Sequence, residues 1–187
     1  MQTVSLRVFS KSKIIAFSAL FAALCCVSTL WLSVPLPASG YFNTGDVFVL
    51  LSGWCLGPVY GGIAAAVGSA LADIIVGYGV YAPATFIIKG LDAIVAYFAW
   101  SALRTVIKTK NSDFISRILS AFLGELCMVA GYFLFDGILA LSLTAALPNL
   151  LGNALQGVCC LVCAVLLISF LQKSKKVNAL FPYLKKE

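Results

Sequence analysis

Apolar runs about as long as a lipid bilayer is thick recur along this chain of 187 residues. A helix needs about 20 apolar residues to cross the hydrocarbon core, and residues 14–34 form the first such run. Hydrophobic residues make up 61% of the chain and charged residues only 11%, and the mean hydropathy is +1.02. About a quarter of the residues of a soluble domain are charged, so this composition excludes an ordinary soluble domain. We predict an all-α integral membrane protein.

Turn residues divide the chain into six candidate helices, which together form one membrane domain over residues 1–187. The predicted helices are 13–34, 45–57, 59–77, 83–104, 115–141 and 147–172. The second is short: thirteen residues rise only about 20 Å, so it could be a half-span. The run at 14–34 is longer than the core of a signal peptide, which predicts an uncleaved first span.

The distribution of Lys and Arg decides between five and six crossings, because cytoplasmic loops collect these residues. With six crossings and a cytoplasmic N-terminus, every cation except Lys89 falls inside. These cations are Arg7, Lys11, Lys13, Arg104, Lys108, Lys110, Arg117, Lys173, Lys175, Lys176, Lys185 and Lys186. We therefore predict a six-helix bundle in the cell membrane with both termini cytoplasmic. The net charge of +6 forms no stripe with interleaved aromatics, so no nucleic-acid partner is expected.

The chain contains no His, which excludes His-based nucleophilic catalysis and His-ligated zinc. The seven Cys residues lie within apolar segments and are interpreted as small packing residues. The acids at 73, 92, 125 and 136 are spread over three helices and two depths, so a metal-dependent membrane enzyme is disfavoured. We expect no enzyme activity, no cofactor and no metal site.

Polar side chains interrupt the predicted helices in their outer halves. Lys89 and Asp92 lie in one helix, and Asp73 lies at a depth similar to that of Lys89 on the helix before it. Asn149, Asn153 and Gln156 share one helix face by their spacing, and Tyr132 and Asp136 share another. Buried charges in a membrane usually face a cavity or one another.

Two interpretations of these residues stay open. Lys89 could form a structural ion pair with Asp73 or Asp92, or the cluster could line a pocket for a small polar molecule. The loop at 33–46 could lay Tyr41, Phe42 or Asn43 over such a ligand, or it could be a solvated connector.

Residues 41–98 carry motifs that resemble those of the substrate-binding S components of energy-coupling factor (ECF) transporters. These motifs are Gly45-Asp46, the L-G-P-x-x-G at 56–61, and the Y-A-P-x-T-F-x-x-K-G at 81–90. The resemblance implies a subunit that binds a vitamin or precursor from outside, without an ATPase of its own. It also implies partners, namely a transmembrane coupling subunit and two cytoplasmic ATPases.

In this family the pocket uses the loop between helices 1 and 2, the loop between helices 3 and 4, and the outer halves of helices 4 to 6. The resemblance therefore adds Asn43 and Phe86 to the candidate ligand contacts. The family's A-x-x-x-A coupling motif matches Ala19 and Ala23, although Ser18 and Ala22 offer a competing register. The nutrient could be riboflavin-, pyridoxine- or hydroxymethylpyrimidine-like, and few aromatics near the pocket favour a single ring. The alternative is a scaffolding membrane subunit whose buried charges are assembly contacts.

Overall fold

The computed structural model describes residues 10–35 and 41–184. Five helices within these ranges are long and apolar enough to cross a membrane. They are α1 (Lys11–Trp31), α2 (Asp46–Val76), α3 (Ala82–Val106), α4 (Ser112–Leu139) and α5 (Leu143–Leu171). The prediction of an all-helical membrane protein is confirmed, and the outer bounds of the predicted helices agree with those observed to within four residues.

Helix α2 covers both the second and the third predicted helices. The direction of its backbone reverses at Gly57, between two helical arms. Gly57 has φ +82° and ψ 179°, a conformation essentially restricted to glycine, and Pro58 starts the second arm. The Ser52 hydroxyl donates to the Gly61 carbonyl at 3.0 Å. Nine residues of straight helix would separate these groups by about 13 Å, so the two arms fold back on one another.

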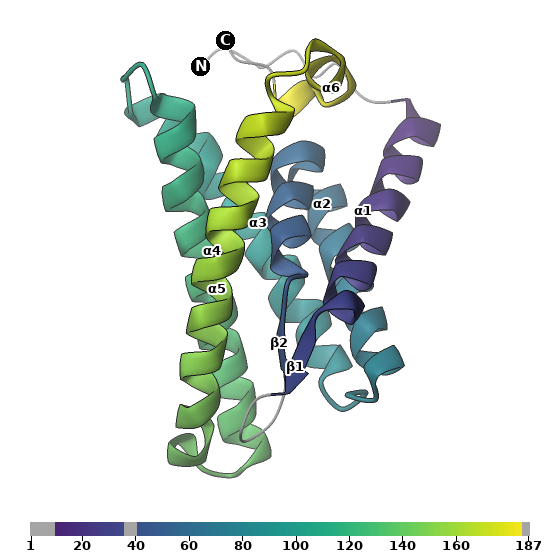
Figure 1. Cartoon of the computed structure of the whole chain (residues 1–187), viewed down its shortest axis with the longest axis vertical. Helices are drawn as coiled ribbons and strands as arrows, with labels where there is room; N and C mark the ends of the chain where they lie inside the picture. Colours follow the sequence, from purple (N-terminus) through teal and green to yellow (C-terminus); the bar gives the residue numbers. More distant parts are fainter. Residues whose placement is uncertain (1–9, 36–40, 185–187) are drawn as a thin grey trace.

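A two-stranded antiparallel hairpin, β1 (Ser33–Pro35) with β2 (Tyr41–Asn43), joins α1 to α2. The sequence analysis assigned this segment to a loop. Strand β2 runs between the helices toward the start of α2 (Figure 1), and Tyr41 and Asn43 are buried. Extended backbone at membrane depth is tolerated where protein covers it, as it does here. The tip of the predicted lid, residues 36–40, lies outside the described residues.

The short helix α6 (Lys175–Leu180) and the 3₁₀ turn η1 (Pro182–Leu184) close one end of the bundle. The Phe181 ring packs 4.9 Å from Phe17 of α1, and the Tyr183 ring lies 5.6 Å from Tyr97 of α3. The start of α1, the turn between α3 and α4, and α6 all lie at this end (Figure 1). Nine of the ten described cations lie in these segments or in the helix turns next to them, so we call it the basic end. Residues 1–9 and 185–187, with Arg7, Lys185 and Lys186, are not described.

The distribution of polar and apolar side chains is opposite to that of a soluble protein. Large apolar side chains such as Ile75, Phe98 and Leu166 are exposed along the outside of the helices. Charged and amide side chains are buried in the interior, among them Asp46 and Gln156. Lipid covers the first set, and the second set needs partners within the protein.

Candidate binding pocket

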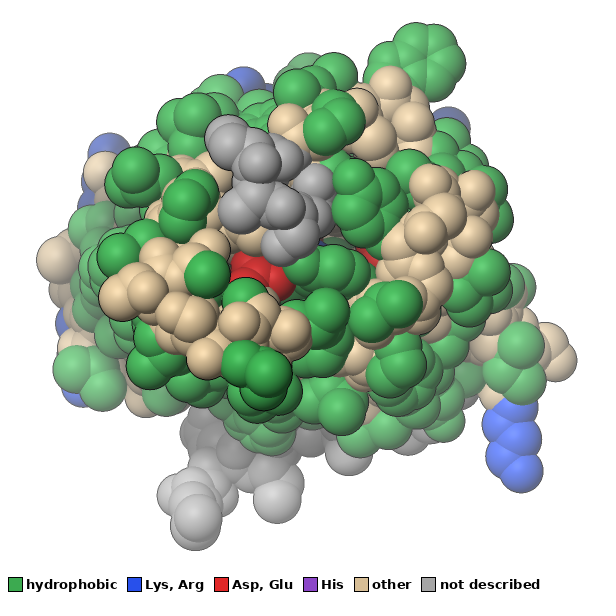
Figure 2. All heavy atoms as spheres, turned by 90° about the horizontal axis from the view of Figure 1, so that it is seen from below, with side chains coloured by type: hydrophobic (Ala, Val, Ile, Leu, Met, Phe, Trp, Pro, Cys, Tyr) green, Lys and Arg blue, Asp and Glu red, His purple; other side chains and the backbone are tan. Residues whose placement is uncertain are grey.

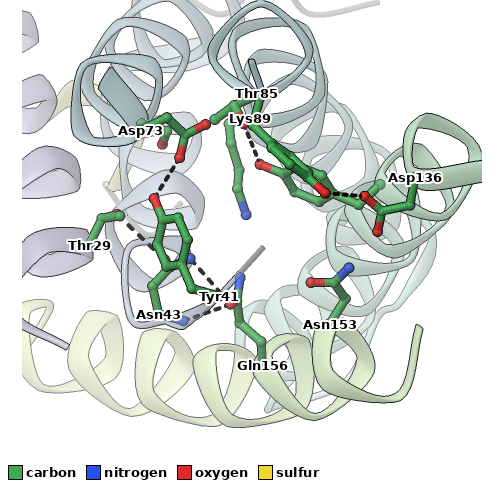
Figure 3. A pocket seen from close by; sticks show the side chains of 12 residues that line it. Thr29, Tyr41, Asn43, Asp73, Thr85, Lys89, Asp136, Asn153 and Gln156 are labelled. Atoms are coloured by element: carbon green, nitrogen blue, oxygen red, sulfur yellow. Dashed lines mark hydrogen bonds between the residues drawn. The ribbon is translucent and has the colours of Figure 1, made fainter. Parts of the chain in front are cut away.

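A pocket lies inside the bundle at the end opposite the basic end, where α2 and α4 finish and α3 and α5 begin. Its empty space, counted with the open mouth, is about 460 Å³. Its wall contains side chains from every long helix and from β2 (Figure 3). The lining residues are Thr29, Tyr41, Asn43, Ser69, Asp73, Tyr81, Thr85, Lys89, Tyr132, Asp136, Asn153 and Gln156. Acidic side chains are visible near the centre of this face (Figure 2).

Lys89 forms an ion pair with Asp46 at the base of the pocket. The predicted pairing with Asp73 or Asp92 was therefore wrong. Asp46 is the first residue of α2, where the helix dipole favours a negative charge, and its second oxygen accepts a hydrogen bond from Gln156 Nε2 at 2.6 Å. The Lys89 ammonium also lies 5.2 Å from the centre of the Tyr132 ring.

Tyr41 of β2 crosses the pocket to α2. Its hydroxyl donates to Asp73 Oδ1 at 2.5 Å. Its neighbour Asn43 is held by Gln156 Oε1, which accepts from the Asn43 backbone N–H at 2.8 Å and from its side-chain amide at 3.2 Å. Strand β2 is thus part of the pocket wall.

The opposite wall is built around Asp136 of α4. Its Oδ1 accepts from the Tyr81 hydroxyl at 2.7 Å, and its Oδ2 accepts from Asn149 Nδ2 at 3.0 Å. Between the two walls, the hydroxyl groups of Thr85 and Tyr132 form a hydrogen bond of 2.9 Å. Each carboxylate on the wall therefore receives hydrogen bonds from uncharged groups.

The pocket brings together seven of the ten predicted ligand contacts: Lys89, Asp73, Tyr132, Asp136, Asn153, Gln156 and Asn43. Asn149 stands behind Asp136, and Asp92 lies deeper in the bundle and does not line the pocket. Phe86 is 46% exposed on the outer surface of α3, because it points away from the face that carries Thr85 and Lys89. Whether the lining residues contact a ligand remains a prediction.

The sequence analysis did not single out five lining or supporting residues as ligand contacts: Thr29, Ser69, Tyr81, Thr85 and Asp46. Asp46, Tyr81 and Thr85 carried a signal, because all three belong to the motifs recognised at 45–46 and 81–90. Tyr41 was assigned to the loop rather than to the wall. Thr29 and Ser69 are short polar residues within apolar helices, and helical spacing alone does not distinguish them from packing residues.

Two further acids lie below the pocket. Asp92 of α3 and Glu125 of α4 are buried, and no oxygen of either carboxylate has a hydrogen-bond partner among the described residues. The Asp92 side chain lies directly against Gly124, and Glu125 lies against Gly157 of α5. Both acids are on the interior face of the bundle, close enough to interact electrostatically with Lys89.

The two candidate coupling residues lie on the outer face of α1. Ala19 and Ala23 are exposed, whereas Ala22 packs against Gly68 of α2. The competing register, Ser18 and Ala22, therefore belongs to the internal contact between α1 and α2. The register of Ala19 and Ala23 is the one that a partner helix could reach.

These features define a class: a multi-pass helical membrane protein with a polar pocket embedded near one face. Comparison with known proteins narrows that class. Residues 9–173 match the family model described as "ECF-type riboflavin transporter, S component". The chain therefore belongs to the family of ECF transporter S components, which are membrane proteins that bind substrate and work with a coupling subunit and ATPases. This is a family of transport subunits and not of enzymes.

One solved structure and one further protein are also similar to this chain. A solved structure titled "Structure and mechanism of the S component of a bacterial ECF transporter" matches with a TM-score of 0.63. The match covers 88% of this chain and 98% of that chain at 18% identity, so it shows the fold. An uncharacterized protein of Pyrococcus woesei, encoded in a gap 3′ region, is 38% identical over 107 residues. That match spans 57% of this chain and 66% of the relative.

Proposed function

We propose that this chain captures a small water-soluble vitamin or vitamin precursor from outside the cell for import driven by ATP hydrolysis in partner subunits. The observation that carries the proposal is the pocket itself. Twelve side chains from five helices, one strand and the turn before α3 line it, in a protein whose helices expose large apolar side chains on the outside. A scaffolding subunit would need charged locks between helices, but not a cavity lined by amides and tyrosines.

In the proposed orientation, the chain crosses the membrane six times and both termini are cytoplasmic. Strand β2 adds about 10 Å to the roughly 16 Å of the first arm of α2, so together they cover most of the hydrocarbon core. The second arm of α2 then makes a separate crossing. The basic end faces the cytoplasm by the positive-inside rule, and the pocket faces outward.

The proposed partner contact is the exposed small-residue face of α1 at Ala19 and Ala23. Small side chains let two helices approach closely in lipid, where packing replaces the hydrophobic driving force. By helical geometry this face lies roughly a quarter-turn around α1 from Ala22, which packs against Gly68. Docking of the coupling subunit there would leave the pocket wall untouched, so capture and coupling use different surfaces of the protein.

The proposed substrate is a vitamin-like ring compound, with riboflavin-, pyridoxine- and hydroxymethylpyrimidine-like molecules as candidates. The family description names riboflavin, and this supports a heteroaromatic ligand. Tyr41, Tyr81 and Tyr132 supply aromatic surface to the wall, and Asn153 and Gln156 supply amides. Such a wall suits a planar ring with polar substituents.

Mass spectrometry of small molecules retained by the gently purified chain tests the capture step. We expect one heteroaromatic compound in near-stoichiometric amount, displaced by an excess of the same compound. Uptake into vesicles that contain the chain, the coupling subunit and the ATPases should then require ATP. A chain that assembles with these partners but retains nothing, and that supports no uptake of any of the three candidates, would support the scaffolding alternative instead.

A further inference from the structure

We propose that the pocket selects a single-ring ligand that carries a positive charge, with its cationic group against Asp73 and a hydrogen-bond donor toward Asp136. This inference rests on the proposed function and names the chemical class of the substrate. It differs from what a flavin would require, because riboflavin carries no positive charge at neutral pH. The argument depends on the charges of the pocket wall and on which polar atoms remain without a partner.

The wall carries an excess of negative charge. Its charged side chains are Asp73, Asp136 and Lys89. The ammonium of Lys89 is already paired with Asp46, which lies directly behind the wall and is fully buried. The opposite charges of Lys89 and Asp46 cancel, so Asp73 and Asp136 remain without a cation among the described residues.

Asp73 is the carboxylate with unused hydrogen-bonding capacity. Its Oδ1 accepts from Tyr41, but its buried Oδ2 has no hydrogen-bond partner among the described residues. The hydroxyl of Ser69, one helical turn earlier on the same face of α2, is also buried and without a partner there. Both groups line the pocket, so an unsatisfied acceptor and a hydroxyl stand side by side on one wall.

Asp136 differs from Asp73 because Tyr81 and Asn149 already donate to its two oxygens. A carboxylate oxygen has a second lone pair, so Asp136 can accept one more hydrogen bond from a ligand. Figure 3 shows Asp73 and Asp136 on opposite sides of the pocket, with Lys89 between them. A ligand that bridges them would carry its cation at the Asp73 end and a neutral donor at the Asp136 end.

Without a ligand, a carboxylate that has no cation beside it is costly to hold inside a membrane protein. A carboxylate surrounded by protein and lipid loses most of its hydration, and a cation brought beside it restores favourable electrostatics. The rings near Asp73 contribute in the same direction. Tyr41, whose hydroxyl donates to Asp73, also lines the pocket, and tyrosine faces attract cations. A neutral ligand would gain neither interaction.

Matched pairs of ligands test the inference with the intact wild-type chain. Pyridoxamine differs from pyridoxine only by an ammonium in place of a hydroxyl. In the same way, 4-amino-5-aminomethyl-2-methylpyrimidine differs from its 5-hydroxymethyl counterpart. By calorimetry at pH 7 on the detergent-purified chain, we expect the ammonium member of at least one pair to bind at least ten-fold more tightly than its hydroxyl partner and than riboflavin.

Variants then locate the selectivity. Asp73→Asn should abolish most of the ammonium preference while changing the affinity for the hydroxyl partner less than three-fold. Asp136→Asn should weaken both members of a pair about equally, because it loses a neutral hydrogen bond. Phe86→Leu, on the outer surface of α3, is the control and should change neither. Thermal unfolding verifies that each variant is folded. If Asp73→Asn does not fold, the comparison of matched ligands on the wild-type chain still decides the inference.

The outcomes separate this inference from the proposed function. Tighter binding of riboflavin or of the hydroxyl compounds would overturn the charge selectivity and leave the capture function intact. An ammonium preference that persists in folded Asp73→Asn would overturn the assignment to Asp73. Failure of all these compounds to bind, together with the absence of ATP-dependent uptake in vesicles, would overturn both.

Discussion

At the scale of single residues, the position of a buried charge depends on the partner that it meets in the fold, and not on its neighbours in the sequence. Lys89 and Asp46 are 43 residues apart, and each would be a stranded ion without the other. We predict that Lys89→Met lowers the free energy of unfolding by about 3–5 kcal/mol, because Asp46 is left buried without its cation. Adding Asp46→Asn should recover part of the loss, since it removes the stranded charge.

Denaturant unfolding in detergent measures these changes, with the Lys89→Met/Asp73→Asn double variant as the matched control. Asp73 has its own donor in Tyr41, so its replacement should not rescue Lys89→Met. Equal rescue by Asp73→Asn and Asp46→Asn would show that Lys89 is shared between the two acids.

Asp92 and Glu125 present the reverse case, because they are acids without partners among the described residues. We predict that Asp92→Asn leaves the stability unchanged or raises it by about 1–3 kcal/mol, since a neutral amide of the same shape costs less to bury. Asp113→Asn should lower the stability. Asp113 accepts from Trp100 Nε1, Arg117 Nε and Gln172 Nε2, and it neutralises the buried guanidinium of Arg117.

Thermal melting of the two Asn variants at neutral pH gives the comparison. A clear loss of stability in Asp92→Asn would mean that this carboxylate has a partner in the folded protein, such as a bound cation.

At the scale of elements, the reversal within α2 depends on one glycine. We predict that Gly57→Ala costs about 1–3 kcal/mol for its backbone conformation, and more where the new methyl group meets the Tyr183 ring about 3.1 Å away. Gly77→Ala also has a positive φ, of +94°, but no atom lies within 4 Å, so it should pay the backbone cost alone. Gly79→Ala has neither feature and serves as the control. The ranking of melting temperatures checks this series, and an unaffected Gly57→Ala would contradict it.

The outer face of α1 is the second prediction at this scale. Ala19→Trp or Ala23→Trp should block assembly with the coupling subunit and uptake, while ligand affinity stays within about two-fold of wild type. Leu166→Trp on α5, another exposed position in the lipid-facing surface, is the control for bulk. Co-purification and calorimetry measure the two effects. Loss of ligand binding with normal assembly would place this face in the pocket or the core.

At the scale of the whole molecule, charge sets the orientation in the membrane. Asn111, in the turn between α3 and α4, and Val80, in the turn between α2 and α3, are both exposed and lie at opposite ends of the bundle. In a variant otherwise free of Cys, we expect a membrane-impermeant thiol reagent added to intact cells to label Val80→Cys and not Asn111→Cys. Labelling of Asn111→Cys from outside would reverse the proposed topology.

The sequence by itself determined the properties that depend on local composition and spacing. The lengths of the apolar runs determined a multi-pass helical membrane protein, and the motifs at 45–46, 56–61 and 81–90 identified its family. Helical spacing of three and four residues predicted that Tyr132 and Asp136 share a face, as do Asn153 and Gln156, and all four line the pocket. These patterns are readable because each is set within a few turns of one helix.

The tertiary structure alone decided which of these faces meet and what pairs across them. Asp46 became the partner of Lys89 because strand β2 and the first arm of α2 enter the bundle beside α3, an arrangement that no spacing along the chain encodes. The same packing turned Tyr41 into a wall residue and Phe86 toward lipid. It also packed Phe181 against α1 and Tyr183 against α3 at the basic end. Contacts between distant segments depend on the rotation and depth of each helix against its neighbours, and these are fixed only when all the elements pack together.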